Sequence, residues 1–316
     1  MAQPFDLVSW TGRLRAALLT GAFLVGACNA TDSFVPDNSS TPPATTDVPS
    51  VDEPSFSTSY AGGMPIGHFH QPLSLYGTTY NGAMLNISAS ELRNELSSIR
   101  NRGGKVMVTF VGAERYYKDS GGHFSLTKWK ARLDRYKNVD ISSFIRDGTL
   151  IGTFLIDEPN DPRNWGGRAI SYSTLEEMAR YSKMRFPGLA TVVRAEASWM
   201  AKYSGTYHYV DAAWAQYLSR RGNVNDYIRN AVASAQKKGL ALVVGLNVLK
   251  GGNPNQTPMN ASELKAYGSA LLSSSYPCAF LSWRYDSNYL SSSSIRDAMK
   301  YLRNKAQARG YKSCRS

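Results

Sequence analysis

The sequence has few residues of the types that bind metals, and it lacks several motifs that mark large enzyme classes. Its 316 residues include only 4 His and 3 Cys, so a histidine-rich metal site has little support. No Gly-x-Ser-x-Gly stretch is present, which argues against a serine hydrolase. No glycine-rich loop follows an apolar run and opens a helix, which argues against a nucleotide site. We therefore expect no cofactor and no metal.

Long apolar runs are confined to the N-terminus. Arg13 and Arg15 precede "AALLTGAFLVGA", a run as long as the apolar region of a secretory signal peptide, and it stops at Cys28. "VGAC" resembles a bacterial lipobox, although Val25 stands where Leu is usual. The pattern predicts a lipoprotein signal peptide over residues 1–27, with lipidation of Cys28. The alternative is ordinary secretion after cleavage nearby, so the protein is expected to be exported and either anchored to the cell envelope or secreted.

The segment that follows differs in composition from the rest of the chain. Residues 28–58 are rich in Ser, Thr, Pro and Asp and offer few side chains for a core, which predicts a disordered tether. Residues 59–316 are expected to form the folded domain. The formal net charge is +12, which favours an anionic environment such as a membrane surface or wall polymer. Basic residues are scattered rather than clustered, so we expect no nucleic-acid partner, and we expect a monomer.

Apolar runs alternate with amphipathic helical segments throughout this domain. Such alternation predicts a parallel sheet covered by helices, and the length fits a (β/α)8 TIM-type barrel. An open doubly wound sheet is the alternative. The predicted strands lie within residues 64–70, 105–112, 150–159, 190–198, 209–217, 240–249 and 278–286. An eighth strand is expected near residue 58 or within residues 113–145.

Polar residues follow or end nearly every predicted strand. In a parallel barrel these strand ends meet at one face, where binding and catalytic loops lie. We therefore expect the polar side chains to converge on one pocket. The residues are His68, His70, Glu114, Arg115, Asp157, Glu158, Arg194, Glu196, Trp214, Gln216, Asn247, Lys250, Trp283, Arg284 and Asp286.

The stretch "FLIDEP" ends a core strand with two adjacent carboxylates, Asp157 and Glu158. A carboxyl group that is partly removed from water has a raised pKa, while a neighbour that receives hydrogen bonds stays ionised. Glycoside hydrolysis uses such a pair, one carboxyl as proton donor and the other as nucleophile or base. The simpler alternative is a turn that begins at Pro159.

Strand alternation extends the prediction to the next strand. In "TVVRAEAS", Arg194 and Glu196 fall on the same face and are expected to point into the barrel mouth. Buried there, they would need each other or a ligand as partner. A purely structural Arg–Glu pair is the alternative.

"FLIDEP" resembles the acid/base strand of the (β/α)8-barrel glycoside hydrolase superfamily, many members of which end that strand in Asn-Glu-Pro. The resemblance implies that Glu158 is the general acid/base and that Asp157 takes the place of the sugar-binding Asn. It also implies that Trp283 in "LSWRYD" forms a platform for the sugar. The usual nucleophile near the end of the penultimate strand is a Glu, and this chain offers Asn247 there. Glu196 is therefore the expected second carboxylate, with Asp157 and Asp211 as the alternatives.

We predict a hydrolase that cleaves glycosidic bonds of a poly- or oligosaccharide. The remaining polar and aromatic residues are expected to bind the sugar: His68, His70, Arg194, Trp214, Gln216, Asn247, Trp283 and Arg284. A non-catalytic carbohydrate-binding barrel lipoprotein is the alternative, favoured by the missing Glu. A third possibility is a metal-dependent enzyme, because "HFH" resembles the metal-binding strand of amidohydrolase barrels.

Two cysteines remain once Cys28 is set aside. Cys278 and Cys314 form an even pair in a chain expected to enter an oxidising compartment. A disulfide between them would attach the C-terminal tail to the last strand. Two separate thiols are the alternative.

Overall fold

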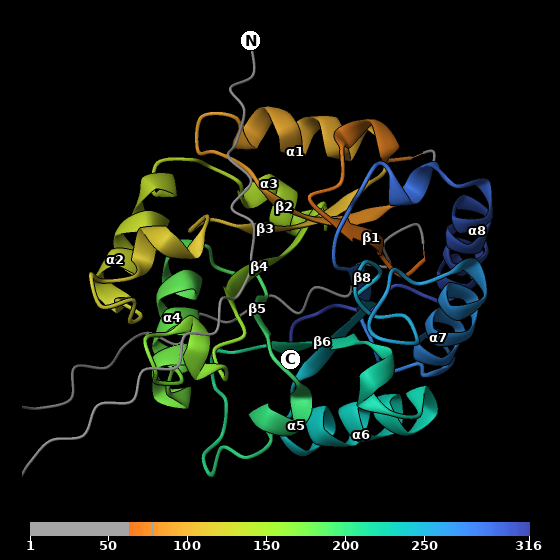
Figure 1. Cartoon of the computed structure of the whole chain (residues 1–316). Helices are drawn as coiled ribbons and strands as arrows, with labels where there is room; N and C mark the ends of the chain where they lie inside the picture. Colours follow the sequence, from red (N-terminus) through yellow and green to blue (C-terminus); the bar gives the residue numbers. More distant parts are fainter. Residues whose placement is uncertain (1–62, 78) are drawn as a thin grey trace, which may run out of the picture. The chain divides into compact units, whose positions relative to one another are not determined.

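The computed structural model describes residues 63–77 and 79–316, which form a closed barrel of eight parallel strands in sequential order (Figure 1). The expectations for residues 1–58, including the signal peptide, Cys28 and the tether, lie outside the described residues. The strands are Ile66–Phe69 (β1), Gly82–Asn86 (β2), Lys105–Thr109 (β3), Leu150–Asp157 (β4), Thr191–Arg194 (β5), Ala212–Tyr217 (β6), Ala241–Leu246 (β7) and Ala279–Ser282 (β8). The TIM-barrel prediction is confirmed.

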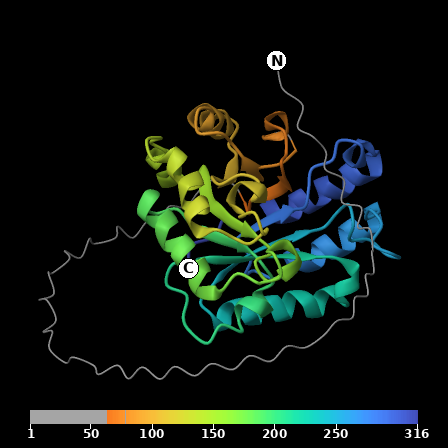
Figure 2. The ribbon, with the colours of Figure 1, turned by 60° about the vertical axis from the view of Figure 1, so that its left-hand side comes forward.

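Helices surround the strands on the outside of the barrel (Figures 1 and 2). The α-helices are Leu92–Asn101 (α1), Leu126–Leu133 (α2), Ser142–Arg146 (α3), Tyr172–Arg185 (α4), Ala197–Met200 (α5), Val224–Lys237 (α6), Ala261–Ser273 (α7) and Ser293–Gln307 (α8). Short 3-10 helices lie at Leu73–Leu75, Glu114–Tyr117, Asp134–Tyr136, Pro162–Asn164, Ser219–Arg221 and Tyr289–Ser291. Within the described residues, no helix has the length and apolar character required to cross a membrane.

The position predicted for the eighth strand was wrong. The strand is β2, "GAMLN", which precedes α1, and no strand element forms within residues 113–145. The connection between β1 and β2 contains only a 3-10 helix, so the expected strand–helix alternation is broken there. Gly67 pairs with Gly82, and a Cβ on Gly67 would lie 1.8 Å from the Gly82 carbonyl oxygen. Two glycines therefore allow this close strand contact, and they weaken the strand signal in the sequence.

Two hydrophobic clusters follow from the alternation of side chains along the strands. One lies between the strands and the helices, and the other fills the barrel. Trp214 belongs to the interior cluster and is fully buried. Its Nε1 donates to the Leu281 carbonyl at 3.2 Å, and its ring centroid lies 5.6 Å from that of Phe154. Trp214 therefore fills the core, and the expectation that it contacts a sugar is corrected.

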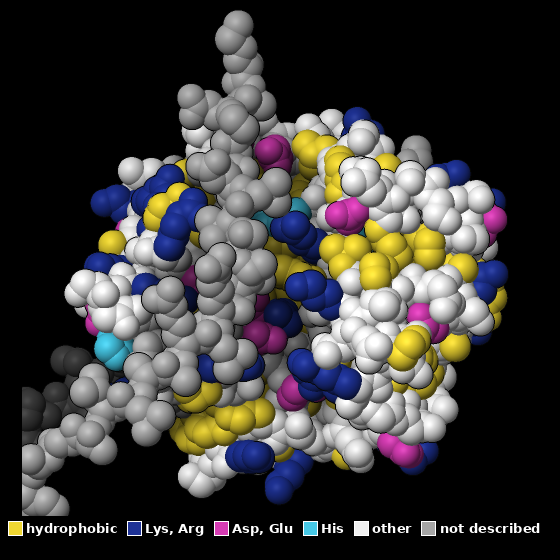
Figure 3. Space-filling model, in the orientation of Figure 1, with side chains coloured by type: hydrophobic (Ala, Val, Ile, Leu, Met, Phe, Trp, Pro, Cys, Tyr) yellow, Lys and Arg dark blue, Asp and Glu magenta, His cyan; other side chains and the backbone are white. Residues whose placement is uncertain are grey.

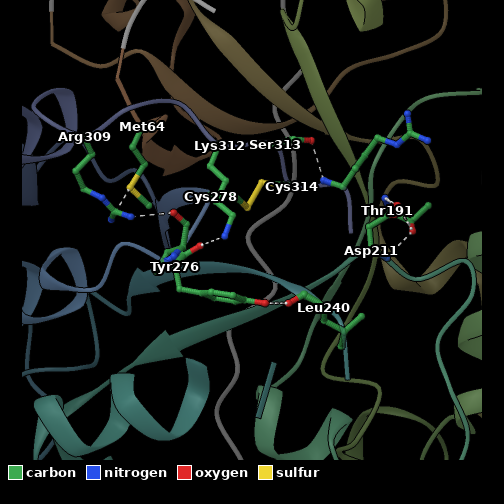
Figure 4. Close-up of a disulfide and its surroundings, with 12 residues drawn as sticks. Met64, Thr191, Asp211, Leu240, Tyr276, Cys278, Arg309, Lys312, Ser313 and Cys314 are labelled. Carbon is green, nitrogen blue, oxygen red and sulfur yellow. Dashed lines mark hydrogen bonds between the residues drawn. A yellow bond between two sulfur atoms is a disulfide. The ribbon is translucent and has the colours of Figure 1, made fainter. Parts of the chain in front are cut away.

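The C-terminal tail lies across the end of the barrel where the strands begin (Figure 4). A disulfide joins Cys278, which immediately precedes β8, to Cys314 in the tail. Both cysteines are buried within the interior cluster. Lys312 Nζ donates to the Tyr276 carbonyl at 3.2 Å, and Ser316 Oγ donates to Asp211 Oδ1 at 3.4 Å. The tail therefore closes this end, and the opposite end remains as the candidate mouth.

Removing the disulfide is expected to destabilise the fold. The bond closes a loop with a sequence separation of 36, so the Cys278→Ala/Cys314→Ala variant should lose roughly 3–4 kcal/mol of unfolding free energy. Urea denaturation of both proteins measures the difference. A reductant should lower the stability of the wild type only, and a loss under about 0.5 kcal/mol would contradict the structural role.

Candidate functional site

A bulge in β4 decides which way its last side chain points. Phe154 pairs with Val192, whereas Ile156 pairs with Val193, so β4 carries one extra residue at this place. Phe154 packs inside the barrel, and Ile156 packs outside it. Asp157 then pairs with Arg194 and shares its inward face. Bulges commonly redirect a side chain beside a functional site, and this one brings Asp157 into the barrel mouth.

Arg194 is the centre of the polar cluster at this mouth. Its Nε and Nη2 contact the two carboxylate oxygens of Asp157, the latter at 3.3 Å. Its Nη1 donates to Gln216 Oε1 at 3.0 Å, and Nη2 lies 3.4 Å from Glu158 Oε1. The guanidinium carbon lies 5.3 Å from the ring centroid of Trp283. Residues contributed by β4, β5, β6 and the end of β8 therefore meet around one cation.

Glu158 occupies a backbone conformation that is uncommon for a residue with a side chain. Its φ is 38°, and its N–H donates to the Arg194 carbonyl at 2.9 Å. Trp165 Nε1 donates to the Glu158 carbonyl at 3.0 Å, which holds the turn. The side chain remains 42% exposed, with Asn164 Nδ2 at 3.4 Å from Oε2. Such strain is often found at functional sites, and here it presents a carboxylate to the opening.

The two adjacent carboxylates have different environments. Burial raises the pKa of Asp157 to about 6, with smaller upward contributions from Glu158 and Glu114 and a downward one from Arg194. The side chain of Asp157 is 22% exposed, compared with 42% for Glu158. The site thus contains a desolvated carboxyl in an ion pair beside a more accessible one. Acidic and basic side chains lie close together near the middle of the face in Figure 3.

Glu196 lies two residues beyond the end of β5 and makes no direct contact with Arg194 among the described residues, although the charge of Arg194 acts on its carboxylate. Glu196 immediately precedes α5. Its carboxylate receives a hydrogen bond from Tyr227 Oη at 2.8 Å and forms an ion pair with Arg221 Nη1 at 2.7 Å. Glu196, Arg221 and Tyr227 all line a pocket of about 510 Å³ beside α6. The expectation that strand alternation pairs Glu196 with Arg194 is corrected.

The two histidines of "HFH" do not share a strand face. His68 lies within β1 and is fully buried, with its ring centroid 5.0 Å from that of Tyr80. His70 lies beyond the strand with a φ of 57° and is exposed at the rim. Both ring nitrogens of His68 lack a hydrogen-bond partner within the described residues, so a sugar-binding role for His68 stays a prediction.

His68 and His70, whose spacing suggested an amidohydrolase-like metal strand, therefore do not lie on one face of a strand. Within residues 63–77 and 79–316, no group of three or more His, Cys, Asp and Glu side chains is arranged to hold a metal ion.

The other predicted residues lie around the same opening. Asn247 follows β7, forms a bridge with Trp283 and accepts the Lys250 N–H at 3.1 Å. Trp283 is partly exposed, and its ring centroid lies 4.5 Å from that of Phe69. Arg284 is exposed beside His70. These positions agree with the expectation of a shared mouth.

Two residues at the mouth are absent from the set predicted to catalyse the reaction or to bind the sugar. Glu114 lies in the 3-10 helix after β3, and its charge acts on Asp157. Thr109 ends β3 and is buried, with no hydrogen-bond partner for Oγ1. Glu114 follows the apolar run "KVMVTFVG", which is the sequence signal for it, whereas Thr109 lies within that run and has no such signal.

Comparisons with known proteins concern the fold. No protein-family model matches the chain, and no curated protein matches its sequence. An endo-beta-1,4-mannanase from Thermotoga petrophila is similar in structure, with a TM-score of 0.51 and 11% identity over 79% of this chain and 78% of that one.

Two further solved structures are similar to the same extent. A GH5-4 broad specificity endoglucanase from Clostridium longisporum has a TM-score of 0.52 and 11% identity, covering 75% of this chain and 86% of that one. Saccharomyces cerevisiae Gas2p, in complex with laminaritetraose and laminaripentaose, has a TM-score of 0.52 and 11% identity, covering 82% and 68%. The chain therefore has the (β/α)8-barrel fold that is found in these sugar-active enzymes.

The electrostatic role of Arg194 predicts a measurable pKa. Carboxyl ¹³C NMR of the wild type should show Asp157 titrating near pH 6. The Arg194→Met variant should shift this pKa upward, because the lost cation favoured the ionised form. The Arg221→Met variant is the control, since Arg221 pairs with Glu196. A downward shift in Arg194→Met, or an equal shift in Arg221→Met, would contradict the assignment.

The buried His68 predicts a dependence of stability on pH. Burial lowers the pKa of His68 to about 4, below the value near 6.5 of an unfolded chain. The unfolded state therefore binds more protons between these values, and the contribution of His68 to stability falls as pH decreases from about 6.5 to 4.

The measurement is the unfolding free energy of the wild type minus that of His68→Gln across this pH range. The difference should increase with pH, by up to about 3 kcal/mol. Taking the difference removes the opposite contribution of Asp157, whose raised pKa makes stability fall as pH rises from about 4 to 6. A pH-independent difference would show that His68 is not buried in its neutral form.

Proposed function

We propose that this protein is a hydrolase that cleaves glycosidic bonds in a poly- or oligosaccharide. The observation that carries the proposal is the cluster at the end of β4, where the side chain of Glu158 is 42% exposed and that of Asp157, beside Arg194, is 22% exposed. A pair of carboxyl groups in different environments is what acid/base cleavage of a sugar acetal requires. The structural likeness to glycanases supplies the fold in which this chemistry is placed.

Glu158 is the proposed proton donor to the leaving glycosidic oxygen. Its carboxyl group is the more accessible of the two, and its backbone is held by hydrogen bonds to Arg194 and Trp165. Asp157, ionised above pH 6 and held by Arg194, is the proposed second carboxylate. Its negative charge would stabilise the positive charge that develops on the sugar ring in the transition state.

The surrounding side chains suit a sugar ring. Trp283 offers a partly exposed aromatic face next to Phe69. Within residues 63–77 and 79–316, Gln216 Nε2 is buried without a hydrogen-bond partner, as is Thr109 Oγ1. Pockets for small ligands typically combine such an apolar wall with a few polar groups that fix orientation.

A non-catalytic carbohydrate-binding barrel is the second candidate. Two observations favour it: Asn247 stands at the end of the penultimate strand, and Glu196 is held in a closed pair with Arg221 and Tyr227. The same aromatic and polar groups would then bind a glycan without cleaving it.

We also propose, from the sequence alone, that residues 1–27 direct export and that Cys28 carries a lipid anchor. The domain would then act at the bacterial cell envelope, as a monomer. Mass spectrometry of the mature N-terminus, with Cys28→Ala as control, tests this proposal. An unlipidated wild-type N-terminus would refute it.

Substitution of the two carboxylates tests the hydrolase directly. Glu158→Gln should reduce the hydrolysis of any glycan that the wild type cleaves by about 100-fold or more, with little change in thermal stability. Glu196→Gln and the exposed control Asp297→Asn on α8 should retain far more activity. Full activity in Glu158→Gln would exclude Glu158 as the acid, and glycan binding without cleavage by the wild type would favour the second candidate.

A further inference from the structure

Three basic residues follow three consecutive strands at the mouth without a side-chain partner. Arg220 follows β6, Lys250 follows β7 and Arg284 follows β8, and each is exposed. Within the described part of the chain, none of their side chains forms a hydrogen bond or ion pair. Lys and Arg side chains lie near one another toward the middle of the face in Figure 3, over the strands.

Most other cations around the mouth already have a partner. Arg194 contacts Asp157, Arg221 contacts Glu196, and Lys118 contacts Glu114 at 2.8 Å. The carboxylates of Asp157, Glu196 and Glu114 are therefore already paired, whereas Arg220, Lys250 and Arg284 form no ion pair within the described residues.

Gln216, a buried polar residue at the mouth, also has a hydrogen-bond donor without an acceptor within the described residues. Gln216 is 3% exposed, its Oε1 accepts from Arg194, and its Nε2 has no acceptor. A buried donor without a partner is destabilising, and a ligand oxygen placed beside Gln216 would satisfy it. An acid group of the glycan would instead pair with the unpaired guanidinium groups of Arg284 and Arg220, because Arg194 is already engaged by Asp157.

A polar pocket of about 550 Å³ is lined by one of the three unpaired cations, Arg220. It lies between the loops that follow β6 and β7 and is lined by Arg220, Asn253, Asn255 and Gln256, among others. Asn255 and Gln256 both have positive φ values, of 61° and 58°. Amide groups beside one cation are suited to the hydroxyls and the acid group of a further sugar unit.

We propose that the glycan bound at this mouth is a polyuronate, a polysaccharide that carries carboxylates along its length. This inference rests on the proposed function only in taking the ligand to be a glycan. Arg284 and Lys250 bind acid groups at the barrel opening, and Arg220 binds one in the adjacent pocket. The formal net charge of +12 favours the approach of such a polymer.

Binding measurements test the substrate class. A short oligogalacturonate should bind more tightly than a neutral cello- or malto-oligosaccharide of equal length, and added salt should weaken its binding. The Lys250→Gln/Arg284→Gln variant should lose roughly tenfold in affinity for it. The control Lys300→Gln removes an exposed charge on α8 and should leave affinity unchanged. Arg220→Gln should weaken binding of a longer oligomer more than of a short one.

Several outcomes would overturn the inference. Equal or tighter binding of the neutral oligosaccharides would do so, as would an equal loss of affinity in Lys300→Gln. Equal binding of dextran sulfate or single-stranded DNA would show a general attraction to polyanions rather than a polyuronate site. Cleavage of a neutral glycan without oligogalacturonate binding would refute the polyuronate inference and leave the hydrolase proposal standing. Oligogalacturonate binding with no cleavage of any glycan would support the polyuronate inference and refute the hydrolase proposal.

Discussion

The ion pair between Arg194 and Asp157 is the interaction on which the arrangement of the mouth depends. Asp157 is buried close to two other carboxylates, Glu158 and Glu114, which both raise its pKa. Like charges in a desolvated site are costly unless a cation compensates for them. Arg194 provides that charge and also contacts Gln216 and Trp283. One guanidinium thus fixes the relative positions of groups from four strands.

The two ends of the barrel differ in character: one is closed by packing, and the other carries the polar mouth. At one end the tail, the Cys278–Cys314 disulfide and the buried Asp211–Lys183 pair at 2.8 Å close the core. At the other end the chain places non-glycine residues with positive φ after β1, β4 and β7: His70, Glu158, Asn255 and Gln256. Packing at the closed end stabilises the fold. The residues at the mouth can therefore be strained and polar, as functional sites require.

The sequence was sufficient for the architecture because the barrel strands are fully buried apolar runs between amphipathic helices. It missed β2 because that strand begins with a glycine and follows no α-helix. Local pattern also placed Asp157 and Arg194 at the mouth. The route by which Asp157 reaches it, a bulge after Phe154, arises from pairing with β5 and has no local signature.

The errors in the site have related physical causes. Alternation of side chains along a longer β5 predicted that Glu196 points into the mouth. The strand ends two residues earlier, at Arg194, and Glu196 immediately precedes α5. Trp214 is an amphipathic residue that tertiary packing buried inside the barrel. Whether a polar residue near a strand end faces the opening depends on where the strand stops, and this is set by contacts that the sequence alone does not reveal.

The central claim is that the carboxylates at the end of β4 act on a sugar held against Trp283. The most direct measurement is a crystal structure of the Glu158→Gln variant with a bound oligosaccharide that the wild type cleaves. The account predicts the scissile glycosidic oxygen within hydrogen-bond distance of side chain 158 and a sugar ring over Trp283. A sugar bound beside Glu196 and Tyr227, with side chain 158 facing only solvent, would contradict it.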